Sequence, residues 1–153
     1  MTEGAFDAYL DTHRQHIEAA LGRSLIALES AVPAAPMEAL RHGVLSGGKR
    51  LRPVLLVAAY EACGGAPREE LYDLAAAVEL IHAYSLMHDD LPCMDDAPLR
   101  RGRPTPHTLY GVDDTTLAGV VLIPWAAAWA LRSVARLECP SSVGVEVAGE
   151  LLA

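Results

Sequence analysis

Seven charged side chains gather in the middle of the chain, in two runs of like charge. The carboxylates and the guanidinium groups that follow them are Asp89, Asp90, Asp95, Asp96, Arg100, Arg101 and Arg103. Carboxylate oxygens suit Mg²⁺, which keeps several waters and bridges to substrate phosphates. Guanidinium groups match phosphate oxygens through paired hydrogen bonds. The cluster therefore predicts a site for a diphosphate carried on Mg²⁺.

The spacing of the four aspartates leaves open which pair binds the metal. On an ideal helix Asp89 and Asp95 point in different directions, whereas Asp89 and Asp96 nearly align. Pro92 disrupts a helix, so we expect the second pair to lie on a distorted turn. The alternative is a helix end followed by a solvated loop. Aspartates at a helix C-terminus oppose its dipole, by about 0.3–1 kcal/mol each when exposed, so four of them there favour a functional cluster.

The only lysine of the chain, Lys49, lies between a Gly47-Gly48 turn and a predicted helix start at Pro53. Backbone N–H groups at a helix start favour anions, and Arg50 and Arg52 add positive charge. The phosphate-binding pattern GxxxxGK[ST] is not present here. This segment predicts a second anion-binding element, with a basic helix start on the protein surface as the alternative.

Several residues before the aspartates share their helix. His82 precedes Asp89 by two turns on the same face, which predicts a place beside the diphosphate, although a buried core histidine is the alternative. Tyr84 and Ser85 lie about one turn below the carboxylates, toward the path of a substrate tail. Tyr84 could equally pack in the core with its hydroxyl bonded. His88 suits Zn²⁺ or Fe better than Mg²⁺, so we expect it to support the ligands.

Helical periodicity dominates the elements that must position these residues. Apolar residues recur at helical spacing over five segments, and a further element begins near the end of the chain: 5–30, 37–45, 53–63, 69–91, 115–137 and 143–153. No segment alternates with period two between hairpin turns. We predict an all-α bundle of antiparallel helices in a single domain over 1–153, with 98–111 as a polar loop and 138–153 unplaced. Asp113 or Asp114 is expected to cap the helix that starts near 115.

Composition excludes several classes of protein. The chain has 153 residues, 52% of them apolar, and its 12 basic against 20 acidic residues give a net charge of −8. The apolar content argues against disorder, and the acidic balance argues against nucleic acid as a partner. Three cysteines without CxxC spacing are typical of reduced thiols in the cytoplasm. The polar start predicts no signal peptide, and the apolar stretch at 117–131, interrupted by Gly119 and Pro124, predicts a buried helix and no membrane span.

Taken together, the motifs resemble the polyprenyl diphosphate synthase family of the farnesyl and geranylgeranyl diphosphate synthase type. They are GGKRLRP at 47–53, HAYSLMHDDLPCMDD at 82–96, LRRGRPTPH at 99–107 and LAG at 117–119. The resemblance implies an all-α bundle of the isoprenoid synthase type around a central cavity, usually as a homodimer. It also implies an Mg²⁺-dependent transferase that joins an allylic diphosphate to isopentenyl diphosphate and releases a C15 or C20 prenyl diphosphate.

The resemblance assigns a role to each matching residue. Asp89 and Asp95 would bind Mg²⁺ with the allylic diphosphate, supported by Asp90 and Asp96, and Arg100 would bind that diphosphate directly. The residues expected to bind isopentenyl diphosphate are Lys49, Arg52, His82 and Arg101. Tyr84 and Ser85 stand where the family sets product length, and the bulk of the tyrosine favours C15 over C20.

The sequence also departs from the family pattern. The 153 residues hold no second aspartate-rich motif, and Val120 stands where family members have an aspartate after LAG. The resemblance therefore covers the N-terminal half of the family fold, over about residues 10–135. Three interpretations follow: part of an active prenyltransferase, a non-catalytic partner of a complete synthase, or a helical domain without a ligand.

Overall fold

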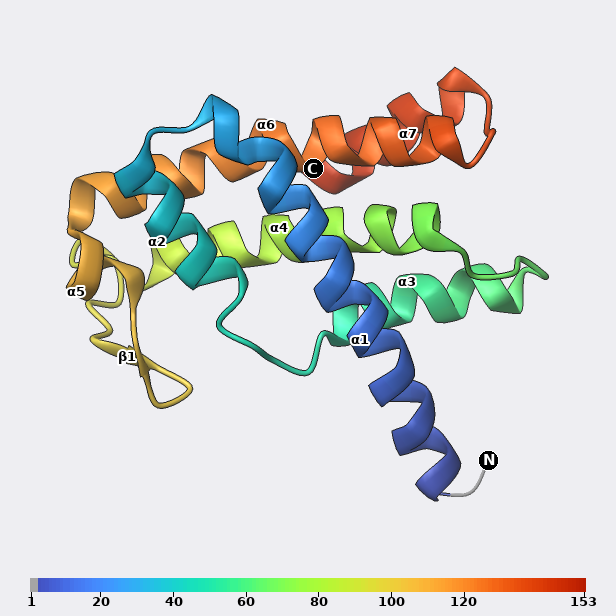
Figure 1. The fold of residues 1–153 in the computed structure, drawn as a ribbon, viewed down its shortest axis with the longest axis horizontal. Coiled ribbons are helices and arrows are strands. Elements are labelled where there is room, and N and C mark those ends of the chain that lie inside the picture. The colour runs from blue at the N-terminus through green and yellow to red at the C-terminus, as the bar shows by residue number, and fades with distance from the viewer. Residues whose placement is uncertain (1–2) are drawn as a thin grey trace.

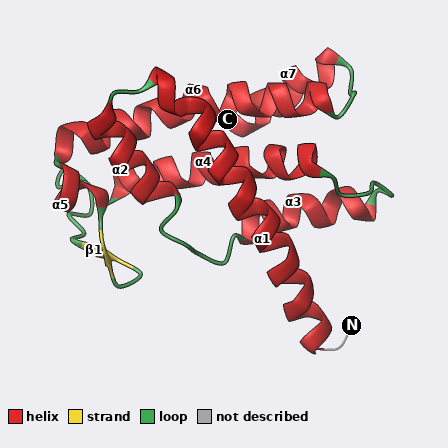
Figure 2. Ribbon diagram, viewed as in Figure 1, coloured by secondary structure: helices red, strands yellow, loops and turns green. Residues whose placement is uncertain are grey.

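The computed structural model describes residues 3–153, and helices form almost all of it (Figures 1 and 2). The helices are α1 (Glu3–Leu28), α2 (Ala34–Val44), α3 (Leu51–Ala62), α4 (Glu69–Asp89), α5 (Pro106–Tyr110), α6 (Val112–Arg136) and α7 (Ser141–Leu152), with a 3₁₀ turn at Glu29–Ala31. Two short strands, β1 (Leu99–Arg100) and β2 (Arg103–Pro104), pair as an antiparallel hairpin. The predicted all-α class is confirmed.

Helix α4 lies at the centre of the bundle. It packs against α6, α1 and α3, while α6 also contacts α7 and α2, and α1 crosses in front of α4 in Figure 1. The apolar side chains that meet between these helices are fully buried: Ile17, Leu21, Leu25, Leu40, Val44, Leu71, Leu80 and Leu122. Burying each such side chain contributes about 1.5–3 kcal/mol. This core fixes the position of the C-terminal half of α4, which carries the predicted site.

A buried ion pair network ties three helices together. Asp73 on α4 is 1% exposed. Its carboxylate accepts hydrogen bonds from Arg23 of α1 at 2.7 Å and from Arg136 of α6 at 2.9 Å. A buried carboxylate is stable only when such partners replace its water. The network therefore fixes α1 and α6 against the N-terminal part of α4.

The predicted polar loop at 98–111 contains more structure than expected. It forms the β1–β2 hairpin and then α5, and the Thr105 hydroxyl fastens it by donating to the Ala97 carbonyl at 2.8 Å. The prediction that Asp113 or Asp114 caps the next helix is wrong. Because Gly111, with φ 88°, is the cap of α6, both aspartates lie in the first turn, where their charge favours the helix dipole.

Helix α6 is apolar enough, by length and composition alone, to cross a membrane. Of its most apolar window, 44% is buried, and the helix packs against α2, α4, α5 and α7. Pro124 lies inside the continuous helix and does not end it. Residues 141–152, unplaced from the sequence, form α7 and pack along α6.

Candidate functional site

The four residues that the resemblance assigns to isopentenyl diphosphate line one cleft. This cleft of about 490 Å³ is lined by Lys49, Arg52, His82 and Arg101. Lys49 comes from the loop before α3, Arg52 from the first turn of α3, His82 from α4 and Arg101 from the hairpin. Arg14 of α1 lines the cleft too, together with the buried Arg50 and Glu79, so positive side chains from three separate parts of the sequence converge on a single hollow. This arrangement is suited to an anion that carries more than one charge.

Arg50 stabilises the backbone segment that forms the cleft. It has a left-handed backbone, with φ 51°, directly before α3. Its guanidinium is buried, and it donates to Glu18 and Glu79 at 2.7 Å each and to the Val44 carbonyl at 2.9 Å. The interpretation that Arg50 adds free charge for an anion is therefore wrong, because these partners already match its charge. Instead, Arg50 ties α1, α2 and α4 to the segment that carries Lys49 and Arg52.

The Gly47-Gly48 turn allows Arg101 to approach the segment that carries Lys49 and Arg52. Arg101 Nη1 donates to the Gly47 carbonyl. A Cβ added to Gly48 would lie 2.3 Å from the same Nη1, and Gly48 has φ +150°. A side chain at this position would meet both a strained backbone and the Arg101 guanidinium.

Gly48→Ala is therefore expected to displace Arg101 and to weaken binding of inorganic diphosphate about tenfold, the equivalent of about 1.4 kcal/mol. Titration calorimetry measures this change. Gly22→Ala is the matched control, because a Cβ at Gly22 meets nothing within 4 Å. Unchanged diphosphate affinity in Gly48→Ala would show that Arg101 does not bind the anion from this position.

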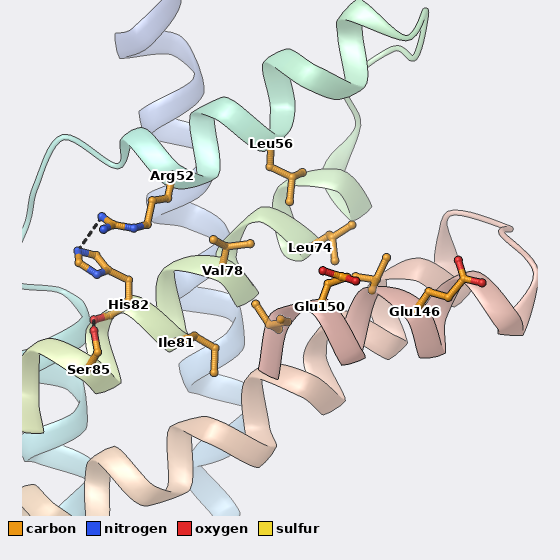
Figure 3. Close-up of a pocket in the computed structure, with 11 residues that line it drawn as sticks. Arg52, Leu56, Leu74, Val78, Ile81, His82, Ser85, Glu146 and Glu150 are labelled. Atoms are coloured by element: carbon orange, nitrogen blue, oxygen red, sulfur yellow. Dashed lines mark hydrogen bonds between the residues drawn. The ribbon is translucent and has the colours of Figure 1, made fainter. Parts of the chain in front are cut away.

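Arg52 and His82 contact each other at the edge of the cleft, with Nη1 of the arginine 3.2 Å from Nε2 of the histidine (Figure 3). Burial, reinforced by the charge of Arg52, lowers the pKa of His82. The imidazole is thus neutral near pH 7 and accepts at Nε2, which places its proton on Nδ1. His82 holds Arg52 in place without neutralising its charge.

The aspartates lie where α4 ends. The Asp95 amide donates to the Asp89 carbonyl at 2.8 Å, so the turn after the helix brings Asp95 back to the helix end. This agrees with the distorted turn predicted from Pro92. Asp90 is 1% exposed and accepts from Nε and Nη2 of Arg100 at 2.8 and 2.7 Å, and this pairing raises the pKa of Arg100. Because two of its donor nitrogens bond Asp90, Arg100 would meet a phosphate through Nη1.

The donor set fits Mg²⁺ held jointly with a substrate. Within residues 3–153, no three His, Cys, Asp or Glu side chains are arranged to hold a metal ion by themselves. Mg²⁺ does not require such a group, because it typically takes one or two carboxylates together with substrate phosphates and water. Asp89 is half-buried and Asp95 is exposed, so both carboxylates are accessible for this purpose.

An apolar groove of about 700 Å³ continues from the cleft and shares Arg52 and His82 with it (Figure 3). Its other lining residues come from three helices, α3, α4 and α7: Leu56, Leu74, Val78, Ile81, Ser85, Glu146, Val147, Glu150 and Leu151. The contributions of α3 and α7 were missed in the sequence, since neither segment carries a polar motif. Their apolar residues at helical spacing were the only available signal.

Of the two residues predicted to set product length, only Ser85 lines this groove. The Tyr84 ring instead packs edge-on against His88, with the ring centroids 5.0 Å apart. His88 Nε2 lies 3.1 Å from the Thr116 carbonyl, so His88 links α4 to α6. The assigned roles of Tyr84 and of the other predicted site residues remain predictions.

Known proteins are similar to this chain in both sequence and fold. Geranylgeranyl pyrophosphate synthase 9, chloroplastic, of Arabidopsis thaliana is 46% identical over 121 residues, which are 79% of this chain and 32% of that synthase. The crystal structure of a geranyltransferase from Legionella pneumophila is 32% identical and superposes with a TM-score of 0.83, covering 94% of this chain and 49% of that one. The chain thus spans about a third to a half of the length of these relatives.

The family model described as polyprenyl synthetase matches residues 34–147. The matched range contains Lys49, Arg52, His82 and Arg101, the aspartates and most of the groove. This chain belongs to the polyprenyl synthetase family.

Proposed function

We propose that this chain supplies the substrate-binding part of an Mg²⁺-dependent prenyltransferase, which condenses an allylic diphosphate with isopentenyl diphosphate to a short-chain prenyl diphosphate. One observation carries the proposal: a cleft lined by several cations, among them Lys49 and Arg101, opens directly onto an apolar groove, with Arg52 and His82 in both. A prenyl diphosphate has a charged head and an apolar tail. The cleft and the groove together match both parts of such a ligand.

Different residues bind the two substrates and exclude water from the reaction. Lys49, Arg52 and Arg101 bind the diphosphate of isopentenyl diphosphate, and His82 keeps Arg52 aimed at it. Asp89 and Asp95 hold Mg²⁺ with the allylic diphosphate, and the metal, when bound, neutralises the charge of that leaving group. The apolar walls of the groove exclude water from the reacting carbons, which favours joining them over hydrolysis.

The partner proposed for the chain is a second copy, giving a homodimer. Helices α5 and α6 expose a set of large apolar side chains, namely Leu109, Val112, Leu117 and Val120. An exposed apolar patch formed by such side chains would favour association. One relative, 52% identical over 104 residues, is named heterodimeric geranylgeranyl pyrophosphate synthase large subunit 1 of Arabidopsis thaliana. That name supports the alternative, in which the chain is a non-catalytic partner of a complete synthase.

The location proposed for the chain is the cytoplasm. Cys63, Cys93 and Cys139 are all free and exposed. Exposed free thiols persist best in a reducing compartment.

Incubation with radiolabelled isopentenyl diphosphate and geranyl diphosphate tests the proposed reaction. We expect Mg²⁺-dependent transfer of label to a longer product, slow for the chain alone because its 153 residues hold one aspartate-rich motif. Retention of labelled isopentenyl diphosphate without transfer would favour the non-catalytic partner. The absence of both transfer and retention would contradict the proposal.

A further inference from the structure

The groove has two chemically different ends. Arg52 and His82 mark one end, and apolar side chains line the middle. Toward the other end Glu150 of α7 lies beside Leu74, and Glu146 lies beyond it (Figure 3). We infer that Glu150 limits how far an apolar tail extends along the groove, and that it is thus a specificity-determining residue for tail length. This inference rests on the proposed function, since it assumes that a prenyl tail occupies the groove.

Packing fixes the place of Glu150. Its neighbours Val147 and Leu151, one turn apart on α7, pack together with Leu74 against the buried cluster of Ala77, Trp129 and Ala130. These contacts set which face of α7 meets α6 and Ala77 of α4. Glu150 lies between the two anchoring residues in sequence and is held at the groove.

The charge of Glu150 has no partner in the described part of the chain. Among residues 3–153 its carboxylate makes no ion pair within 4.0 Å and no side-chain hydrogen bond, and the residue is exposed to water. An apolar tail that covered this carboxylate would remove its water and give it no replacement. Burying an unpaired ionised carboxylate is strongly unfavourable, whereas covering Val78 or Leu74 is favourable.

The groove is long enough for this limit to matter. Helix α4 rises 1.5 Å per residue, so the groove spans about 16 Å along the axis from Ser85 to Leu74. Asp89 lies one turn beyond Ser85, about 22 Å from Leu74 along the axis. Carbon–carbon bonds of about 1.5 Å give an extended isoprene unit of roughly 5 Å. A tail that starts at the aspartates therefore reaches Leu74, and with it Glu150, after about four units.

Titrating the chain, in Mg²⁺, with prenyl diphosphates of 10, 15, 20 and 25 carbons tests the inference. We expect affinity to rise at least about tenfold with each added unit up to C20, as apolar surface is buried, and not to rise from C20 to C25. Glu150→Leu should restore the gain at C25. Glu38→Leu, at an exposed glutamate of α2 that lies outside the groove, is the matched control and should leave the break at C20.

The possible outcomes separate the two proposals. Diphosphate-dependent binding with no break at C20, or a break that Glu150→Leu does not move, would overturn the inference and leave the proposed function standing. A break that moves in Tyr84→Ala but not in Glu150→Leu would overturn it in favour of Tyr84. Affinity that depends neither on the diphosphate nor on the length of the tail would contradict the proposed function itself.

Discussion

Replacing Arg50 by methionine is expected to lower the free energy of unfolding by about 3–5 kcal/mol, the usual result of removing one partner from a buried ion pair. The change leaves Glu79, 4% exposed, without its guanidinium, and leaves the Val44 carbonyl without a donor. Glu18 suffers less, because about a third of its side chain is exposed. Chemical denaturation of the two proteins, followed by circular dichroism, measures the loss.

Arg41→Met is the matched control for this prediction. Arg41 pairs with Glu29 at 2.9 Å, but the glutamate side chain is 59% exposed. A pair of that kind contributes about 0–1 kcal/mol. If Arg50→Met cost no more than Arg41→Met, Arg50 would not hold the cleft in shape, and its charge would again be available for an anion.

The double substitution Lys49→Gln with Arg52→Gln is expected to lower affinity for isopentenyl diphosphate at least about a hundredfold. Each hydrogen bond to a charged group contributes about 1.5–3 kcal/mol, which is about ten- to a hundredfold in affinity. Both side chains line the cleft and neither carries the buried Arg50 network. The fold should therefore stay intact while binding of the anion is weakened. Calorimetric titration would measure the affinity, and thermal unfolding would measure the stability of the fold.

Arg132→Gln controls for the loss of positive charge. Arg132 lies over the Trp129 ring, 5.2 Å from its centroid, at the far end of α6 and outside the cleft. Its removal should leave affinity for isopentenyl diphosphate within about twofold, since exposed charges beyond about 10 Å are largely screened at 0.1 M salt. An equal loss in both variants would indicate attraction by overall charge, not binding in the cleft.

The elements of this fold could be predicted from apolar spacing, because most helices bury one face. The prediction was less accurate where tertiary contacts determine the local structure. The hairpin at 99–104 has too few residues to alternate visibly, and Gly111 replaced the expected aspartate cap of α6. Pro124 would break an isolated helix, yet α6 continues through it because neighbouring helices pack around it.

The candidate site was predictable to the extent that it consists of charged motifs. Lys49, Arg52, His82 and Arg101 were named from sequence, and they line one cleft. What spacing could not reveal is which charges are already paired. Arg50 is adjacent to Lys49 in sequence but buried among carboxylates, and Asp90 is adjacent to Asp89 but occupied by Arg100. The groove was missed because its walls come from ordinary apolar positions on three helices.

Titration of the chain with a prenyl bisphosphonate, once in Mg²⁺ and once in EDTA, tests most directly whether the aspartates, the cleft and the groove form one site. The head of this probe resists hydrolysis, and its tail is apolar, as the middle of the groove is. The structure predicts saturable binding of one molecule per chain in Mg²⁺ and at least about tenfold weaker binding in EDTA, because Asp89 and Asp95 can meet a diphosphate only through the metal. Equal affinity in Mg²⁺ and EDTA would contradict the account.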